Sequence, residues 1–394
     1  MIEPNIPYLS LDTPAVLVDM GKLEANIAEM SRLAAEAGVK LRPHVKVHEC
    51  ASIAKLQIEA GACGVDVGSV GQAEAMAEEG IDDILISHPG YYGSHKQEKL
   101  RKLLGKDGLK VTIVVDMVEQ AEGASQAAQA VGRTIPVLIK VDTNAPLGGY
   151  SRLGVLPGEP VLNLAKKLLT IPAIELIGVY AHEMGKAENT DKMAFETASI
   201  MRETANMLRG EGVTVEHVSV GASNTFRSTC RYIKEGKFPH ITEIHPGNCV
   251  IGDLGYMRKG ANTRESCAVT VLTTVISTAH PEKAAIDAGY KTFGSDYNID
   301  AVNDPDYFWN GMASFGSVQG RPDLRAGRMS AETGYLYYMN PEKKLRFGER
   351  LEIVPNNATL VINIHDQLYG VRNGAVERAF QVTGRGRGNW MTPG

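Results

Sequence analysis

The chain has 394 residues, of which 43% are hydrophobic and 22% are charged. This composition is ordinary for a soluble globular protein, and the length is sufficient for one large domain and a smaller one. The formal net charge of -5 at pH 7 argues against a nucleic acid or an anionic membrane as a partner.

The sequence carries no apolar run long enough to span a membrane, and its N-terminus lacks a basic stretch followed by an apolar one. The five cysteines are scattered and form no CxxC pair: Cys50, Cys63, Cys230, Cys249 and Cys267. Such a set is typical of reduced thiols. We therefore expect a cytoplasmic protein without a signal peptide or a membrane span.

Short β-branched runs alternate with helical patterns over the first two-thirds of the chain. The predicted strands begin at Ala15, Lys40, Cys63, Asp83, Val111, Pro136, Glu175 and His217. Apolar residues recur at helical spacing between most of them, for example over 23–34. Apolar strands separated by helices indicate a parallel sheet covered on both faces, and eight such units predict a (β/α)8 TIM barrel.

A doubly wound open sheet is the structural alternative, and the residues at the strand ends favour the barrel. Polar side chains stand at or just past the C-terminal ends of the strands: Asp19, Lys46, Ser69, His88, Asp142, His182 and Ser223. In a barrel these ends converge on one mouth, where active sites are built. In an open sheet they would be spread along an edge.

The pattern changes after about Gly247. Strand-like runs begin at Cys267, Lys283, Glu349 and Ala358, with turn residues and little helical periodicity between them. The sequence therefore predicts a barrel over 12–250 and a smaller C-terminal β-domain over 251–385. The N-terminal segment 1–11 is a candidate to pack on that β-domain.

Lys46 lies between two histidines in the stretch LRPHVKVH, residues 41–48. Most lysines at such a position are partly solvated residues at the end of a strand, without a chemical role. A lysine at a barrel mouth can instead be desolvated, which lowers its pKa and makes the amine a nucleophile. If the strand continues through this stretch, His44 and His48 share a face with Lys46.

Two loops after late strands are rich in small and hydroxylated residues. VGASNT begins at Val220 and HPGN begins at His245. Barrels use backbone N–H groups and hydroxyls in this region to hold a phosphate, although each loop alone is a weak signal. The candidate phosphate ligands are Ser223, Asn224, Thr225, Gly247 and Asn248.

Arg152 and His182 are two further candidate site residues, and each can be interpreted in two ways. Arg152 lies in a glycine-containing loop, either as a surface residue or as a fixed cation at the barrel mouth. His182 follows an apolar strand, either as a buried histidine with satisfied hydrogen bonds or as a wall for a planar cofactor.

Together these features resemble the fold-type III pyridoxal-phosphate enzymes, and within them the D-threonine aldolase / D-serine dehydratase-like branch. The similar segments are LDTPAVLVD, RPHVKVH, AGACGVDVGSVGQAEAMAEEGIDDILIS, IDAGYK and IHDQLYGVRNG. The resemblance implies that Lys46 forms a Schiff base with pyridoxal 5'-phosphate and that Arg152 faces the pyridine nitrogen. It also implies that His182 packs on the ring and that the five candidate ligands bind the phosphate. His44 and His48 become candidates for cofactor packing and proton transfer.

One departure from the family concerns a divalent metal. Metal-dependent members of the branch carry His-x-Cys or His-x-Asp where this chain has Asn357 and Thr359, and the family's usual E-H-G is altered to Glu332-Thr333-Gly334. Neutral amide and hydroxyl oxygens are poor ligands for zinc or manganese. We expect that the metal is absent or that the chemistry at the β-substituent differs.

The resemblance implies a lyase that acts on a D-configured 3-hydroxy amino acid, by retro-aldol cleavage or by dehydration. A metal-free amino-acid racemase or epimerase of the alanine racemase type is the alternative. A non-catalytic cofactor carrier is a third reading, but such single-domain proteins lack a C-terminal β-domain. A homodimer with shared active sites is implied by the resemblance alone.

Overall fold

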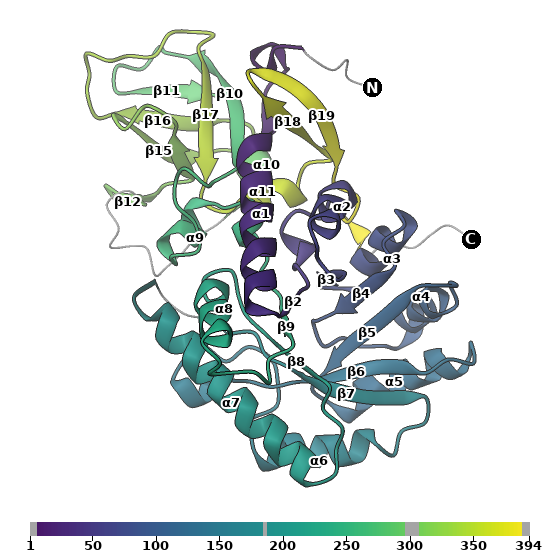
Figure 1. The fold of residues 1–394 in the computed structure, drawn as a ribbon. Coiled ribbons are helices and arrows are strands. Elements are labelled where there is room, and N and C mark those ends of the chain that lie inside the picture. The colour runs from purple at the N-terminus through teal and green to yellow at the C-terminus, as the bar shows by residue number, and fades with distance from the viewer. Residues whose placement is uncertain (1–5, 184–186, 296–306, 388–394) are drawn as a thin grey trace. The chain divides into compact units, whose positions relative to one another are not determined.

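The computed structural model describes residues 6–183, 187–295 and 307–387 (Figure 1). The chain forms two compact units, one made of residues up to Asn26 with Asn248–Arg385 and the other of Ile27–Gly247 with the tail from Gly386. The chain passes from the first unit into the second within helix α1 (Met20–Ala37). Each unit has its own sheet.

The sheet of the second unit has eight parallel strands. They are β2 (Lys40–Leu41), β3 (Val65–Val67), β4 (Asp83–Ile86), β5 (Lys110–Val115), β6 (Ile135–Lys140), β7 (Ile174–Tyr180), β8 (His217–Val220) and β9 (Glu243–Ile244). Their order is β2-β9-β8-β7-β6-β5-β4-β3. A parallel bridge between His44 and Asp66 joins the segment after β2 to β3, so that the two ends of the sheet meet. The predicted (β/α)8 barrel is confirmed.

The helices of this unit follow its strands and cover the sheet from outside (Figure 1). They are α2 (Ala51–Glu59), α3 (Val70–Glu78), α4 (Ser94–Leu104), α5 (Val118–Gln129), α6 (Glu159–Leu168), α7 (Thr190–Gly210) and α8 (Phe226–Lys234). In α6 the buried residues are Val161, Leu164, Ala165 and Leu168, at the spacing of one helical face. The same periodicity in the sequence is what predicted these helices.

The sheet of the first unit is mostly antiparallel, as predicted for the C-terminal β-domain. It contains β1 (Ala15–Asp19), β10 (Val269–Ser277), β11 (Lys283–Ile286), β14 (Gly316–Val318), β15 (Leu324–Met329), β16 (Gly334–Tyr338), β17 (Arg350–Pro355), β18 (Gln367–Arg372) and β19 (Ala375–Gln381). The pair β12 (Phe308–Trp309) and β13 (Met312–Ala313) stands apart, and the short helices are α9 (Leu254–Arg258), α10 (Tyr290–Phe293) and α11 (Ala358–Asn363).

Two strand predictions were wrong. The run from Ala15, predicted as the first barrel strand, is the central strand β1 of the other sheet, where Leu17 pairs with Thr270 and Tyr369. An apolar run that is buried on both faces is compatible with either sheet. The periodicity of the sequence therefore could not show to which sheet this run belongs. The eighth barrel strand is β9, whose two residues are too few to recognise. The run from Ala358 is the helix α11, because Asn357 caps it by accepting a hydrogen bond from the Leu360 N–H at 3.1 Å.

The N-terminal residues pair with the edge of the first unit's sheet. The N–H of Tyr8 donates to Gly374 O at 3.1 Å, and the N–H of Val376 donates to Ile6 O at 2.9 Å. The Tyr8 hydroxyl donates to Glu352 Oε1 at 2.8 Å. The compact units therefore differ from the expected division at 12–250 and 251–385, chiefly because β1 and this segment belong with the β-domain sheet.

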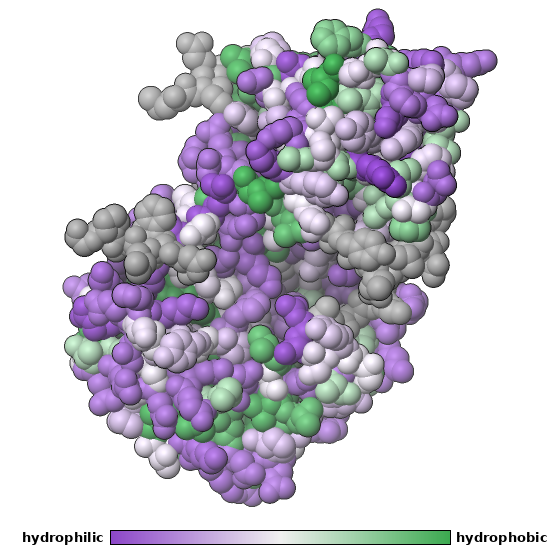
Figure 2. Space-filling view, turned by 180° about the vertical axis from the view of Figure 1, so that it is seen from behind, coloured by the Kyte–Doolittle hydropathy of each residue, from purple (hydrophilic) through white to green (hydrophobic). Residues whose placement is uncertain are grey.

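Hydrophilic residues cover much of the face shown in Figure 2. Within the described residues, no helix combines the length and the apolar character needed to cross a bilayer.

Candidate active site

Lys46 lies in the segment that follows β2 (Lys40–Leu41), in a single 3₁₀ turn formed by Val45–Val47. The expectation that the strand continues through residue 48 was wrong, and with it the argument that alternation places both histidines beside Lys46. Lys46 lines a pocket in the barrel unit. The described residues around this pocket are His44, Lys46, Ser87, His88, Lys140, Asn144, Arg152, Leu153, Tyr180 and His182.

The pocket is built from the C-terminal ends of neighbouring strands. Ser87 follows β4, Lys140 ends β6, and Tyr180 ends β7. Five residues singled out from the sequence meet here: His44, Lys46, His88, Arg152 and His182. Lys140 and Tyr180 were missed, although the charged end of the apolar run IPVLIK was a usable signal for Lys140.

His48 is absent from the described residues that line the pocket. Its Nε2 lies 3.2 Å from Gln57 Oε1, and its Nδ1 accepts a hydrogen bond from the Cys50 N–H at 3.1 Å. Burial lowers the pKa of His48 to about 4. Both ring nitrogens thus contact α2, one at its N-cap residue Cys50 and one at Gln57 within the helix, which is a structural role.

His44, in contrast, faces the barrel interior. Its Nδ1 lies 3.1 Å from Asp66 O, its Nε2 lies 3.4 Å from Ser87 Oγ, and its ring meets that of His88 edge-on at 5.8 Å. Burial holds the pKa of His44 well below its usual value and lowers that of His88 to about 3. Both rings are therefore neutral near pH 7, and they can shape the pocket without adding charge.

Three cationic side chains converge on the pocket: Lys46, Lys140 and Arg152. Burial lowers the pKa of Lys46, and the charge of Arg152 lowers it further. Burial likewise lowers the pKa of Lys140 to about 8. A lysine with a lowered pKa has more of its amine in the neutral, nucleophilic form than an ordinary lysine at the same pH, and a group of cations suits an anionic ligand.

Two carboxylates hold the loop that carries Arg152. Asp142 accepts hydrogen bonds from the Asn144 N–H at 2.9 Å, the Ala145 N–H at 3.2 Å and the Ser151 hydroxyl. Asp116 Oδ2 accepts from the Gly154 N–H at 3.0 Å, on the other side of Arg152. The loop is thereby fixed on both flanks of the arginine, which gives its charge a defined position.

The expected phosphate loops meet at the start of α8. Ser223 and Asn224 precede this helix, Thr225 is its N-cap residue, and the Gly247 N–H donates to Ser223 Oγ at 3.2 Å. A Cβ at Gly247 would lie 3.0 Å from His44 O, which is a tight contact, so a larger residue here would require this backbone to shift. Helix N-termini favour anions, because their N–H groups and dipole are positive.

Thr225 and Asn248 make contacts that the sequence did not predict. The Thr225 hydroxyl donates to Glu183 Oε1 at 2.5 Å and accepts from the Ala222 N–H at 2.9 Å. Asn248 belongs to the other unit and donates to Asp253 Oδ2 at 2.9 Å. The assignment of these two residues as phosphate ligands stays a prediction.

Glu183 is a buried carboxylate that sequence reasoning missed. Besides the Thr225 hydroxyl, it accepts the Gly221 N–H at 3.1 Å, and burial raises its pKa. Glutamine at 183 would offer only one acceptor to these two donors. Glu183→Gln is expected to lower the free energy of unfolding by about 1–3 kcal/mol, because one buried donor stays unpaired. Urea unfolding measures this; the exposed control Glu203→Gln should change it by less than about 0.5 kcal/mol.

The positions that correspond to the family's metal ligands lie in the first unit. Asn357 caps α11, and Thr359 is the second residue of that helix. Within the described ranges 6–183, 187–295 and 307–387, no group of three or more His, Cys, Asp or Glu side chains is placed to hold a metal ion.

Comparisons with known proteins define the class to which this barrel and pocket belong. Residues 18–254 match the family model described as "Alanine racemase, N-terminal domain", and residues 268–371 match a model for a serine dehydratase domain. The chain belongs to the alanine racemase N-terminal domain family, and the resemblance inferred from its motifs is confirmed.

Several relatives match over nearly the whole chain. A 3-hydroxy-D-aspartate aldolase of Paracoccus denitrificans is 28% identical, over 98% of this chain and 95% of the relative. A D-threo-3-hydroxyaspartate dehydratase of a Delftia species is 30% identical, over 89% and 91%. The crystal structure of a D-threonine aldolase from Filomicrobium marinum superimposes with a TM-score of 0.83 at 28% identity, covering 98% and 99% of the two chains.

Proposed function

We propose that this chain is a pyridoxal-phosphate-dependent lyase that acts on a D-configured 3-hydroxy amino acid. The observation that carries the proposal is Lys46: a largely desolvated amine with a lowered pKa, at the mouth of a barrel, among further cations. The relatives named above are aldolases and dehydratases of D-configured hydroxy amino acids by their descriptions.

The residues of the pocket and of the loop before α8 fit pyridoxal phosphate by the chemistry of their donors. Lys46 offers the amine for covalent attachment, and Ser223, Asn224 and the N-terminus of α8 offer donors for a phosphate. His182 Nδ1 is buried without a hydrogen-bond partner in the described part of the chain, next to the stacked rings of His245 and Tyr180. This ring stack is a flat surface against which a planar cofactor can pack.

When bound, pyridoxal phosphate withdraws electrons from the bonds at the substrate's Cα. The chain's own residues then decide which proton moves. Lys46 Nζ, once free, can accept a proton from the substrate, because burial lowers its pKa to about 8 and so makes the neutral amine far more available near pH 7 than in an ordinary lysine. The fixed charge of Arg152 is assigned to the pyridine nitrogen, as the family resemblance implies.

The position of proton removal distinguishes the reactions. Removal from the β-hydroxyl breaks the Cα–Cβ bond and releases an aldehyde, and Cα then takes up a proton to give glycine. Removal from Cα with loss of hydroxide gives an unsaturated amino acid, which water hydrolyses to a keto acid and ammonia. Removal from Cα with return on the opposite face would be racemisation, the alternative function. Asn357 and Thr359 at the metal-ligand positions favour a reaction with little need for a divalent ion.

The expected result of a product assay is cleavage or dehydration of D-configured substrates with little effect of a chelator. Purified enzyme is given D- and L-threonine, D- and L-serine, phenylserine and 3-hydroxyaspartate, with and without the chelator, and the products are identified. Loss of optical rotation without cleavage or ammonia release would establish a racemase instead. Complete inactivation by the chelator, reversed by manganese or zinc, would contradict the interpretation of Asn357 and Thr359.

We further infer a cytoplasmic homodimer with shared active sites, which follows from the family resemblance. Light scattering on the purified protein measures its mass in solution. A monomer with full activity would contradict the shared sites.

A further inference from the structure

A second cavity lies beside the candidate active-site pocket, within the barrel unit. It has a volume of about 170 Å³ and is lined by residues at the ends of β3 and β4 and in the first turns of α4. Ser87 lines the active-site pocket, Ile86 lines the second cavity, and His88 lines both. The end of β4 therefore separates the two spaces, and the ring of His88 is shared between them. We call the second space the His88–Tyr92 cavity.

Two buried polar atoms in the lining of this cavity have no hydrogen-bond partner in the described part of the chain. They are the hydroxyl oxygen of Tyr92, a residue that is 2% exposed, and Nδ1 of His88. Burial raises the pKa of Tyr92, so its hydroxyl stays protonated and can donate. Buried polar groups are nearly always hydrogen-bonded, so these two atoms indicate a partner that is not part of the chain.

Glycines keep space open beside both atoms. A Cβ at Gly90 would lie 3.5 Å from the Tyr92 hydroxyl oxygen, and a Cβ at Gly68 would lie 3.5 Å from His88 Nδ1. Tyr92 itself is held in place, because its carbonyl oxygen packs against α5, where a Cβ at Gly123 would lie 2.3 Å from it. The hydroxyl thus has a defined position at the edge of an open space, as a binding group requires.

The other walls of the cavity indicate an uncharged ligand with an aromatic body. Lys99 Nζ lies 2.9 Å from Glu74 Oε2, so its charge is balanced, and the second lysine of the lining, Lys96, is exposed to solvent. Aliphatic and aromatic walls of this kind favour a planar apolar group. The residues that supply them are Val70, Ile86, Pro89, Tyr91 and Tyr92.

We propose that the His88–Tyr92 cavity is the subsite for the substrate's side chain, and that it takes an aromatic ring bearing an oxygen to which the Tyr92 hydroxyl donates. A substrate that spans both cavities contacts the neutral ring of His88, which lines each of them. The inference deepens the proposed function and rests on it, because the amino-acid part of this substrate has to occupy the Lys46 pocket. The substrate class is then a D-configured 3-aryl-3-hydroxy amino acid with an oxygen on the ring.

Three small probes test the cavity without substrate. Phenol carries a ring and an oxygen, toluene carries a ring of similar size without an oxygen, and benzoate carries a ring with a charge. Binding to the purified full-length protein is measured by ligand-observed NMR titration, with the cofactor content held equal between samples. We expect phenol to bind about three- to tenfold more tightly than toluene, because it pairs with the Tyr92 hydroxyl. Benzoate should displace phenol no better than toluene does, because Glu74 already balances the charge of Lys99.

Two variants assign the binding to this cavity. Tyr92→Phe is expected to bind phenol and toluene about equally, because the ring remains and the donor is gone. Gly90→Ala places a methyl group beside the hydroxyl and should weaken phenol binding by about tenfold. Tyr232→Phe is the matched control, because this tyrosine lies on α8 and does not line the cavity. It should keep the wild-type preference for phenol.

Kinetic measurements connect the cavity to the substrate. The ratio of kcat/KM for D-configured 3-(4-hydroxyphenyl)serine to that for D-serine is expected to fall about tenfold in Gly90→Ala, because serine carries no ring to place in the cavity. In Tyr232→Phe the ratio should stay at the wild-type value.

An unchanged ratio in Gly90→Ala, equal binding of phenol and toluene to the wild type, or a phenol preference that persists in Tyr92→Phe would overturn the proposal. Benzoate that binds more tightly than the phenol it displaces would overturn it as well, since the cavity would then be an anion site. The probe measurements need no turnover. A phenol preference that Tyr92→Phe abolishes, in a protein without lyase activity, would therefore reject the proposed function alone.

Discussion

Replacing Lys46 by alanine is expected to lower kcat/KM on D-configured 3-hydroxy amino acids by on the order of 10⁴-fold or more. In the proposed function the side chain supplies both the amine for covalent attachment of the cofactor and the base for proton removal, so one substitution removes both. The same variant should lose the absorbance band that covalent attachment to the amine produces. Activity assays and absorbance spectra of freshly purified protein measure the two effects.

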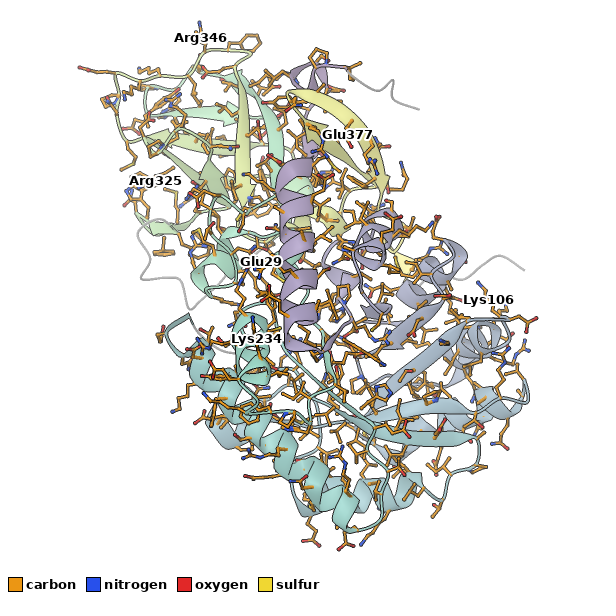
Figure 3. The ribbon with its side chains drawn as sticks, in the orientation of Figure 1. Glu29, Lys106, Lys234, Arg325, Arg346 and Glu377 are labelled. Atoms are coloured by element: carbon orange, nitrogen blue, oxygen red, sulfur yellow. The ribbon has the colours of Figure 1, made fainter. Side chains whose placement is uncertain are left out.

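The stability of Lys46→Ala should not fall with its activity. Burial penalises the Lys46 ammonium, so its removal is expected to leave the melting temperature unchanged or slightly raised. Lys106→Ala is the matched control, because Lys106 points away from the barrel unit into solvent (Figure 3). It should keep wild-type activity and absorbance. A Lys46→Ala enzyme with activity within tenfold of wild type would show that Lys46 is not the reactive amine.

The periodicity of apolar residues in the sequence was sufficient to predict the barrel and the β-domain, but it did not show where each of them begins. Helices with a single buried face, such as α6, and apolar strands separated by them indicate a parallel sheet covered by helices, and the polar residues at the strand ends favour its closure into a barrel. The run at Ala15 lies between residues of the C-terminal sheet, and only long-range pairing with β10 and β18 reveals it. A two-residue strand such as β9 carries no periodicity at all.

Part of the candidate site could be predicted from the sequence, because the C-terminal ends of barrel strands converge on one mouth. Lys46, Arg152 and His182 follow different strands and meet in one pocket, as this argument requires. His48 was misplaced, because a 3₁₀ turn replaces the expected strand and rotates its ring toward Gln57. Glu183 escaped notice, because the functional meaning of a buried carboxylate depends on partners that are distant in sequence.

A buried polar network crosses the barrel interior through Arg42, and it supports a second large prediction. Arg42 Nε donates to Glu243 Oε2 at 2.8 Å, and its Nη1 donates to Asp83 Oδ1 at 2.6 Å. The Ser219 hydroxyl donates to Glu243 Oε1 at 3.0 Å. The network thus joins the end of β2 to β4, β8 and β9, where the strands β2 and β9 are only two residues long.

Arg42→Met is expected to lower the free energy of unfolding by about 3–5 kcal/mol, because it leaves the Glu243 carboxylate buried without its cation. The side chain of Glu243 is 4% exposed and that of Arg42 is 11% exposed, so water cannot replace the lost partner. Urea unfolding of the full-length chain measures the loss, with the cofactor content held equal between samples.

Arg32→Met is the matched control, because Arg32 forms an ion pair with Glu36 on α1 while its side chain is 58% exposed. Its expected loss is about 0–1 kcal/mol. The double variant Arg42→Met/Glu243→Gln should recover part of the single variant's loss, because no unpaired charge then stays buried. A loss below about 1 kcal/mol in Arg42→Met would mean that water reaches Glu243 inside the barrel. In that case the two short strands would be held by backbone pairing and apolar packing, and the charged network would serve only to align Ser219 with the His245 ring at 2.9 Å.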